Sequence, residues 1–457
     1  MALSWYLASF KSFIMELTLV SSLRVLETIN PAKILLLGYA SYVVLGWIFL
    51  SLPVSQNVPV SNIDNLFTAT SAVSTTGLVT VDPSLSYSFF GELVILLLIQ
   101  IGGIGYMTFG SFVILSTRHK MSSFRTRLTK SAFSLPSDFE IGRFIKMVVI
   151  FTLVCEAIGA VGLYLIFLSH GVDDAIWNAI FHSVSAFCTA GFSLNSNSLM
   201  EFVDNPMLNF VVAALAYTGA IGFIVATDIW QRLTGRQKFL HFTTKIILEV
   251  TIWFALVGTI LFFIIEPSIQ QMPPWQRLMA SFFQVMTAST TVGFNTIDIG
   301  GLSASIIMLM YVFMIFGASP SGTGGGLKST TLAALLGLIK STLKRRETVR
   351  VHKRELSSER LQIATASFAF YMVVLTGAMI LLLALESATF EIILFEAISA
   401  LGTVGLSMGL TGDLTVLGKL IIILLMLMGR VGILTFGIAM AMHDESREEE
   451  DDDDLVV

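Results

Sequence analysis

The sequence has little charge, few histidines and only two cysteines. Charged residues make up 13% of its 457 residues, well below the share that is usual in soluble domains. Cys155 and Cys188 have no spacing typical of a disulfide framework or a metal site, and no H-E-x-x-H motif occurs among the six histidines. These absences argue against a soluble domain, a disulfide-stabilised fold and a zinc hydrolase. The two cysteines are interpreted as small apolar residues.

Apolar residues are correspondingly frequent. They make up 54% of the chain, and the mean hydropathy of +0.81 is typical of a polytopic membrane protein. A helix that crosses a bilayer needs about 20 apolar residues. Eight spans are predicted, at 34–52, 89–115, 145–168, 206–229, 245–265, 305–339, 363–385 and 416–441, of which the sixth is broken in the middle. The predicted fold class is therefore an all-α polytopic membrane protein.

An eleven-residue pattern, F-x-x-x-[ST]-A-x-x-T-x-G, occurs four times between the predicted spans. The copies are residues 67–77, 181–191, 283–293 and 395–405. Five fixed positions that match four times without gaps indicate a fourfold internal repeat. Each copy lies between an outgoing and a returning span, so each unit is predicted to be a helix, a pore loop and a second helix.

The basic residues predict how these units are oriented. Seven Lys and Arg lie within 118–146, four within 232–245 and eight within 340–360, whereas nine carboxylates crowd into 444–454. By the positive-inside rule the three basic connectors, and both termini, are cytoplasmic. All four units then share one orientation, and parallel units can surround a single pseudo-fourfold pore, whereas inverted repeats are typical of alternating-access carriers.

The repeats and connectors divide the chain into six parts. These are a cytoplasmic interfacial segment (1–33), repeat 1 (34–116), repeat 2 with its connector (117–231), repeat 3 with a broken inner helix (232–340), repeat 4 with its connector (341–443) and an acidic tail (444–457).

The end of each copy is predicted to form a cation selectivity filter. A potassium ion in a pore must exchange its water for other oxygens, and rings of backbone carbonyls supply them. A glycine allows four chains to crowd together at the axis. The predicted filter residues are Thr76, Gly77, Ala190, Gly191, Val292, Gly293, Val404 and Gly405, supported by Thr75, Thr189, Thr291 and Thr403.

The ion expected at this filter is potassium. No copy has Asp or Glu at its closing position, so a carboxylate ring of the divalent-cation type is absent. The longer T-V-G-Y-G stretch is missing too, which favours one tight carbonyl site over a column of several.

A glycine-rich stretch, 317–331, interrupts the sixth span and is called the gate loop below. Glycines and a proline prevent a regular helix here, and a polar, flexible break below the third copy is predicted to obstruct the pore. Its candidate residues are Gly317, Ser319, Ser321, Gly322, Thr323, Gly324, Gly325, Gly326 and Lys328. A phosphate-binding loop is not expected, because Leu327 separates Gly326 from Lys328 and no strand precedes the stretch.

Arg430 is a base within the eighth span, and such residues are functional by default. It is predicted to face the conduction path or to bind carbonyl oxygens of the gate loop. The alternative is a structural ion pair with Glu156 or Glu249. Glu396 is interpreted as an acid at the start of the fourth pore helix and not as a filter ligand.

Two other functions are considered. A carrier that couples potassium to sodium or protons would need titratable groups on its path, and Glu156, Glu249 and Asp228 are the candidates. A membrane hydrolase would need a nucleophile and a base, but His182 and its serine neighbours do not face each other on a helix. No enzymatic activity and no nucleic-acid partner are expected.

Four linked units with one filter glycine each, the Gly-Gly-Gly-Leu-Lys-Ser run at 324–329 and Arg430 resemble the Trk/Ktr/HKT superfamily of potassium transporters over residues 34–441. Eight spans with a short amino terminus are similar to the bacterial Ktr-type membrane subunit.

The resemblance implies potassium uptake across the plasma (inner) membrane by a homodimer with one pore per subunit. It also implies a cytosolic nucleotide-binding ring of the RCK type as regulatory partner, so that a nucleotide acts only through that partner. Sodium is a possible activator, since some members depend on it, and no covalent cofactor is expected.

Overall fold

The computed structural model describes residues 31–105, 141–352 and 354–440. Helices dominate these residues, as predicted. Within them the one sheet is a hairpin of β1 (Arg350–Val351) and β2 (Arg354–Glu355), with Arg350 opposite Glu355. The predicted acidic tail lies outside the described residues. The predicted interfacial segment 1–33 lies outside them as well, except for residues 31–33, which begin the first helix.

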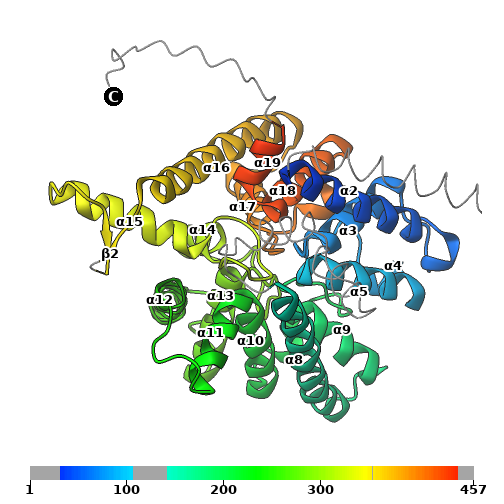
Figure 1. The fold of residues 1–457 in the computed structure, drawn as a ribbon. Coiled ribbons are helices and arrows are strands. Elements are labelled where there is room, and N and C mark those ends of the chain that lie inside the picture. Colours follow the sequence, from blue (N-terminus) through cyan, green and yellow to red (C-terminus); the bar gives the residue numbers. More distant parts are fainter. Residues whose placement is uncertain (1–30, 106–140, 353, 441–457) are drawn as a thin grey trace, which may run out of the picture.

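Four sets of helices follow one another along the chain and surround a common centre (Figure 1). The first set is α2 (Pro31–Leu50), α3 (Asn62–Val73), α4 (Pro83–Ser86) and α5 (Phe89–Ile104). The second is α8 (Ile141–Ser169), α9 (Ala175–Phe187), α10 (Pro206–Ile221) and α11 (Phe223–Leu233). The third is α12 (Phe242–Ile265), α13 (Pro274–Thr290), α14 (Ala304–Phe316) and α15 (Ser329–Leu343). The fourth is α16 (Ser358–Leu385), α17 (Phe390–Gly402), α18 (Val416–Val431) and α19 (Ile433–Met440).

The sets pack on one another in cyclic order. The returning helix of each set contacts the short helix of the next: α5 packs on α9, α10 on α13, α14 on α17, and α18 on α3. The fourth set thereby closes on the first. Large apolar side chains on the outer helices are exposed, for example Ile158 at 70%, Ile264 at 61% and Val373 at 67%, as expected for surfaces that face lipid.

Local sequence sets where three of the returning helices begin. Ser88, Asn205 and Thr415 are amino-terminal caps whose side-chain oxygens accept hydrogen bonds from the first turns of α5, α10 and α18. Such caps satisfy backbone donors that have no partner within the helix. Ser303, before α14, instead donates its hydroxyl to Glu266 at 2.8 Å.

Glycines on the returning helices allow close packing. A Cβ atom added to Gly102, Gly219, Gly317 or Gly429 would collide with the carbonyl oxygen of Val73, Phe187, Ser289 or Leu401, respectively. These four carbonyls belong to the same position of the repeated pattern. The glycines therefore let each returning helix contact the end of the short helix of its own set.

Within residues 31–105, 141–352 and 354–440, four helices are long and apolar enough to cross a membrane by themselves, and the number is six if each of two bent pairs counts as one span. The bent pairs correct the sequence prediction. Spans 206–229 and 416–441 were expected to be continuous, but α10 and α11 meet at 97° and α18 and α19 at 104°. Gly222 and Gly432 have φ values of 97° and 94°, which end an α-helix. The predicted break of the sixth span lies between α14 and α15.

Candidate selectivity filter and gate loop

The four short helices, α3, α9, α13 and α17, end at the predicted filter residues. The pattern's phenylalanine is fully buried in every copy, and so is its alanine; these are Phe67, Phe181, Phe283 and Phe395, with Ala72, Ala186, Ala288 and Ala400. The apolar positions thus fix each short helix in the core, since replacing a buried phenylalanine with alanine costs about 3–5 kcal/mol.

The backbone then makes the same turn in every copy. The pattern's threonines have left-handed φ values of 51° to 59°, and the filter glycines have φ values of 67° to 95°; the residues are Thr75, Thr189, Thr291 and Thr403, with Gly77, Gly191, Gly293 and Gly405. A non-glycine residue with positive φ costs about 1–3 kcal/mol. Its occurrence at one position in all four copies indicates that the local fold enforces this turn.

The pattern's serine or threonine, which the sequence analysis did not assign, stabilises the turn. The amide groups of Thr76, Ala190, Val292 and Val404 donate to the carbonyls of Ser71, Ser185, Thr287 and Ser399, at 2.8 to 3.2 Å. In two copies the hydroxyl also accepts a hydrogen bond from the filter glycine: Gly77 N lies 3.0 Å from Ser71 Oγ, and Gly405 N lies 3.1 Å from Ser399 Oγ. The repeated Ser or Thr at the fifth position of the pattern was the sequence signal that could have indicated this role.

The four filter segments form a closed ring. A Cβ atom on Gly77 would collide with the carbonyl oxygen of Ala190, one on Gly191 with that of Val292, one on Gly293 with that of Val404, and one on Gly405 with that of Thr76. Each carbonyl thus packs on a filter glycine of a neighbouring set, and the series returns to its start. The structure therefore brings all eight predicted filter residues together around one axis.

The gate loop contacts the threonines that precede the filter. Thr75 Oγ1 donates to the Thr323 carbonyl at 3.3 Å, and Thr189 Oγ1 donates to the Thr323 hydroxyl at 3.0 Å. Gly325 N donates to Thr403 Oγ1 at 2.8 Å. Gly324 also lies close to Thr291: a Cβ atom added to Gly324 would be only 2.5 Å from Thr291 Oγ1. Residues 323–325 therefore touch all four sets directly next to the filter.

The flanks of the gate loop are bound to the surrounding helices. Thr323 N donates to the Gly219 carbonyl at 3.1 Å, and Gly326 N donates to the Gly429 carbonyl at 3.2 Å. Lys328 Nζ donates back to the Gly324 carbonyl at 2.9 Å. The remaining candidates also have partners: Ser319 contacts Ser329, Ser321 accepts from the first turn of α11, Gly322 packs on the Ala220 carbonyl, and Gly317 packs on Ser289.

Arg430 joins the gate loop to the first set of helices. Its Nη1 donates to the Thr323 carbonyl, and its Nη2 donates to the Gly102 carbonyl and, at 3.4 Å, to that of Gly103. The last two carbonyls lie at the carboxyl end of α5, where a helix favours a cation.

The two carboxylates proposed as ion-pair partners of Arg430 bind elsewhere. Glu156 accepts hydrogen bonds from Gln100 Nε2 at 3.2 Å and from Cys188 Sγ at 3.7 Å. Glu249 pairs with His352 at 2.7 Å. The third titratable candidate of the carrier hypothesis, Asp228, accepts from the Gln237 side chain at 2.6 Å. Among the described residues, none of the three carboxylates is hydrogen-bonded to a filter or gate-loop residue.

The interpretation of Glu396 as an acid at the start of the fourth pore helix was wrong. It does not open a helix, because α17 begins at Phe390 and carries Glu391 in its first turn. Glu396 is fully buried and accepts a hydrogen bond from Ser407 Oγ at 2.9 Å and another from Thr411. Thr389 at the N-cap and Glu391 in the first turn are the sequence signals of this earlier start, which the choice of Glu396 overlooked.

Glu396 belongs to a position that is polar in every copy, the residue after the pattern's phenylalanine. The others are Thr68, His182 and Gln284, and all four are fully buried. His182 Nε2 lies 3.0 Å from Ser193 Oγ, and Gln284 Nε2 donates to Thr296 Oγ1 at 3.1 Å. The side chains of His182, Gln284 and Glu396 thus bind the segment that follows the filter, a role that the sequence analysis did not assign.

Comparison with known proteins identifies the family. The model of the TrkH family, described as a cation transport protein, matches residues 40–450. The Ktr system potassium uptake protein B of Vibrio alginolyticus is 36% identical over 90% of this chain and 91% of its own length. That of Bacillus subtilis (strain 168) is 34% identical over 91% and 94%.

Two further similarities agree. The potassium/sodium uptake protein NtpJ of Enterococcus hirae is 35% identical over 90% of this chain and 93% of its own. The crystal structure of the potassium transporter TrkH from Vibrio parahaemolyticus has the same fold, with a TM-score of 0.72 at 20% identity, over 91% of this chain and 86% of that one. The chain belongs to the TrkH family of cation transport proteins.

Proposed function

We propose that the protein takes up potassium ions across the plasma membrane through a filter formed by four single-glycine pore loops. The closed ring of carbonyl groups from Thr76, Ala190, Val292 and Val404 carries this proposal. Carbonyl oxygens crowded at one axis can replace the hydration shell of potassium. The similar proteins from Vibrio alginolyticus and Bacillus subtilis are potassium uptake proteins by name, which supports this choice of ion.

The proposed architecture is four parallel helix–pore loop–helix repeats with eight spans around one pseudo-fourfold pore. In this assignment α10 with α11 is the fourth span, α14 with α15 the broken sixth, and α18 with α19 the eighth. The cyclic packing of the four sets supports it. The termini and the carboxyl end of α15 are proposed to be cytoplasmic, which the basic connectors support.

The gate loop is proposed to close the pore below the filter. Its contacts with the threonines of all four sets support this role, because residues 323–325 then lie across the ion path. Arg430 holds the loop in this position through the Thr323 carbonyl.

Regulation is proposed to come from a partner. Similarity to the Ktr proteins favours a homodimer that rests on a cytosolic nucleotide-binding ring of the RCK type. Sodium is proposed as an activator; the relative from Enterococcus hirae is named a potassium/sodium uptake protein, which associates sodium with this family.

The test is potassium and sodium flux into liposomes that contain the purified protein, with Gly405→Ser beside the wild type. Gly409→Ser is the matched control, because Gly409 has a similar φ of 94° but nothing within 4 Å of an added Cβ atom. Gly405→Ser is expected to reduce the preference for potassium, and Gly409→Ser to leave it unchanged. Equal effects of the two substitutions would remove Gly405 from the filter.

The same liposomes separate this proposal from a sodium- or proton-coupled carrier. In the proposed pathway the potassium gradient alone drives the flux. Potassium accumulation that needs an imposed sodium or proton gradient would favour the carrier.

A further inference from the structure

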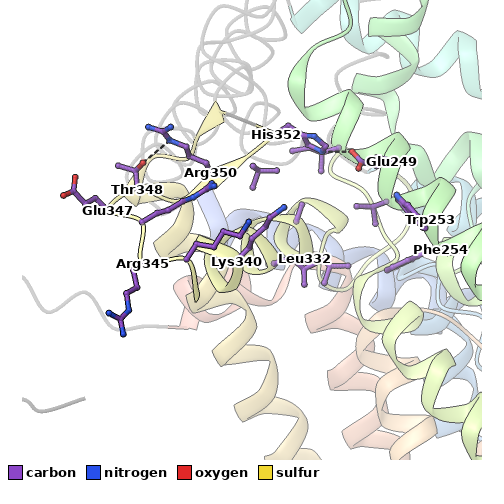
Figure 2. Close-up of a pocket in the computed structure, with 18 residues that line it drawn as sticks. Glu249, Trp253, Phe254, Leu332, Lys340, Arg345, Glu347, Thr348, Arg350 and His352 are labelled. Atoms are coloured by element: carbon purple, nitrogen blue, oxygen red, sulfur yellow. Dashed lines mark hydrogen bonds and ion pairs between the residues drawn. The ribbon is translucent and has the colours of Figure 1, made fainter. Parts of the chain in front are cut away.

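A cavity of about 1150 Å³ lies outside the filter and gate loop, between α15, α12 and the β1–β2 hairpin (Figure 2). None of the predicted filter or gate residues lines it. In Figure 1, α15 extends away from the common centre, and the hairpin lies at its far end. The cavity therefore opens at the periphery of the molecule.

One face of α15 changes from apolar to basic along the cavity. Leu332 and Leu336 are followed at four-residue intervals by Lys340 and Lys344, and all four line the cavity. Residues four apart share one side of a helix. Across the cavity, Trp253 of α12, which is 60% exposed, extends the apolar wall.

The hairpin holds the cavity in shape. Val351 packs closely on Gly337 of α15: a Cβ atom added to Gly337 would lie 2.5 Å from Val351 Cγ2. Arg350 N donates to Ser341 Oγ at 3.2 Å. On the other side, His352 Nε2 lies 2.7 Å from Glu249 Oε2 of α12. The hairpin is thus attached to both helices, and the cavity is part of the fold.

The basic side chains at the cavity are mostly unpaired. Five Lys and Arg residues line it, namely Lys340, Lys344, Arg345, Arg346 and Arg350. Within the described ranges only Arg350 has an ion pair, with exposed Glu355 at 4.0 Å, which contributes little. Of the two acids, Glu249 is occupied by His352 and Glu347 points away from the cavity, whereas Lys340 lies inside it (Figure 2). The cavity therefore has an excess of positive charge.

We propose that this cavity binds an anionic phospholipid of the inner leaflet, with its phosphate between Lys340 and Lys344 and its acyl chains against the apolar wall. A soluble anion would explain the basic residues but not the adjoining Leu336 and Trp253, which a lipid chain covers. Basic pockets between membrane helices on the cytoplasmic side suit anionic headgroups. The assignment rests on the proposed orientation and not on the proposed potassium transport.

The test is lipid binding to the full-length protein in detergent, measured by native mass spectrometry. Phosphatidylglycerol is expected to bind, and phosphatidylcholine with the same acyl chains to bind far more weakly. Lys340→Gln/Lys344→Gln is expected to weaken phosphatidylglycerol binding by about 25-fold, since each basic residue near an anionic headgroup contributes about fivefold. Trp253→Ala is expected to weaken it too, without a change in charge.

The matched control is Arg236→Gln/Lys238→Gln, which removes two exposed charges from the connector between α11 and α12. It is expected to leave lipid binding unchanged, and unaltered thermal unfolding of each variant shows that it folds. Equal loss in control and test variants, or equal binding of glycerol phosphate without acyl chains, would overturn the proposal. Displacement of the lipid by a peptide of residues 444–457 would assign the cavity to an acidic segment instead.

Discussion

Among single residues, Arg430 is the one from which the largest change in gating is expected. Its guanidinium binds carbonyls of both the gate loop and α5, and a hydrogen bond from a charged group contributes about 1.5–3 kcal/mol. Arg430→Gln is therefore expected to free the gate loop and raise basal potassium flux by about 10-fold or more. Flux is measured in liposomes without a cytosolic partner.

Arg277→Gln is the matched control for this change. Arg277 also donates to a backbone carbonyl, but to that of Phe263, and its guanidinium lies 4.2 Å from the centre of the Phe263 ring, with no bond to the gate loop among the described residues. Basal flux that stays unchanged in Arg430→Gln, or that rises equally in Arg277→Gln, would contradict the gating role.

That the four glycines and their threonines make the same turn and lie together could be predicted from sequence because they repeat; that they form a cation filter stays a prediction. Ser71 and Ser399 occupy a repeated position as well. Their residue type alone does not show that their hydroxyls accept hydrogen bonds from the amides of Gly77 and Gly405. The polar position of His182 and Glu396 was harder to find, because four different residue types occupy it. The four side chains at this position share only their burial, which can be seen in the packed structure but not in the sequence.

At the level of elements, the gate loop depends on glycines that leave room for the filter threonines. A Cβ atom on Gly325 would lie 2.4 Å from Thr403 Oγ1 and 2.9 Å from the Gly429 carbonyl. Gly325→Ala is therefore expected to displace the loop and to increase basal flux in liposomes. Gly377→Ala on α16 is the control, since an added Cβ atom there meets nothing within 4 Å. Lower or unchanged flux in a folded Gly325→Ala protein would argue against the loop as a gate.

An ion pair joins the start of α3 to α18. Asp64 Oδ1 lies 2.7 Å from Lys419 Nζ, and the two side chains are 13% and 12% exposed. Burial alone would raise the pKa of the Asp64 carboxyl, but hydrogen bonds from Lys419 and Ser61 outweigh it and lower that pKa below its usual value. The lowered pKa gives stability above the unfolded pKa of about 4, and this stability is lost as the pH falls through the folded pKa.

Asp64→Asn is therefore expected to lower the temperature of thermal unfolding at pH 7, by an amount that corresponds to about 1 kcal/mol. The difference from the wild type is expected to shrink as the pH falls below about 4, because the wild-type carboxyl then becomes protonated. A difference that is constant from pH 7 to pH 3 would show that the charge of Asp64 does not stabilise the fold.

Hydropathy predicted which segments are helical but not where they turn. The runs 206–229 and 416–441 are mostly apolar, yet each bends by about a right angle at a glycine. Mean hydropathy does not show this change in direction, because apolar residues lie on both sides of each bend. The break at 317–328 was predictable, because a proline and several glycines interrupt the apolar run there.

The whole molecule is a ring in which each set completes the site of its neighbour. The sequence predicted four equivalent units from spacing alone, and the ring adds which carbonyl meets which glycine. This order could not be predicted, because the repeat pattern does not show whether units that follow one another in the sequence also lie next to one another around the axis. The contacts show that they are, since α5, α10, α14 and α18 each pack on the following short helix.

Closure of the ring predicts that the four filter glycines act alike. In each of the variants Gly77→Ser, Gly191→Ser, Gly293→Ser and Gly405→Ser, the new side chain meets a carbonyl of a neighbouring set. Every variant is expected to lower the preference for potassium over sodium in liposome flux, because the displaced carbonyl no longer fits the ion. Gly409→Ser again controls for backbone strain without crowding. If one variant alone kept the wild-type preference for potassium, its loop would lie outside the ion path, and the pore would be built from three sets. If all four variants lost this preference while Gly409→Ser kept it, the selectivity would belong to the ring as a whole.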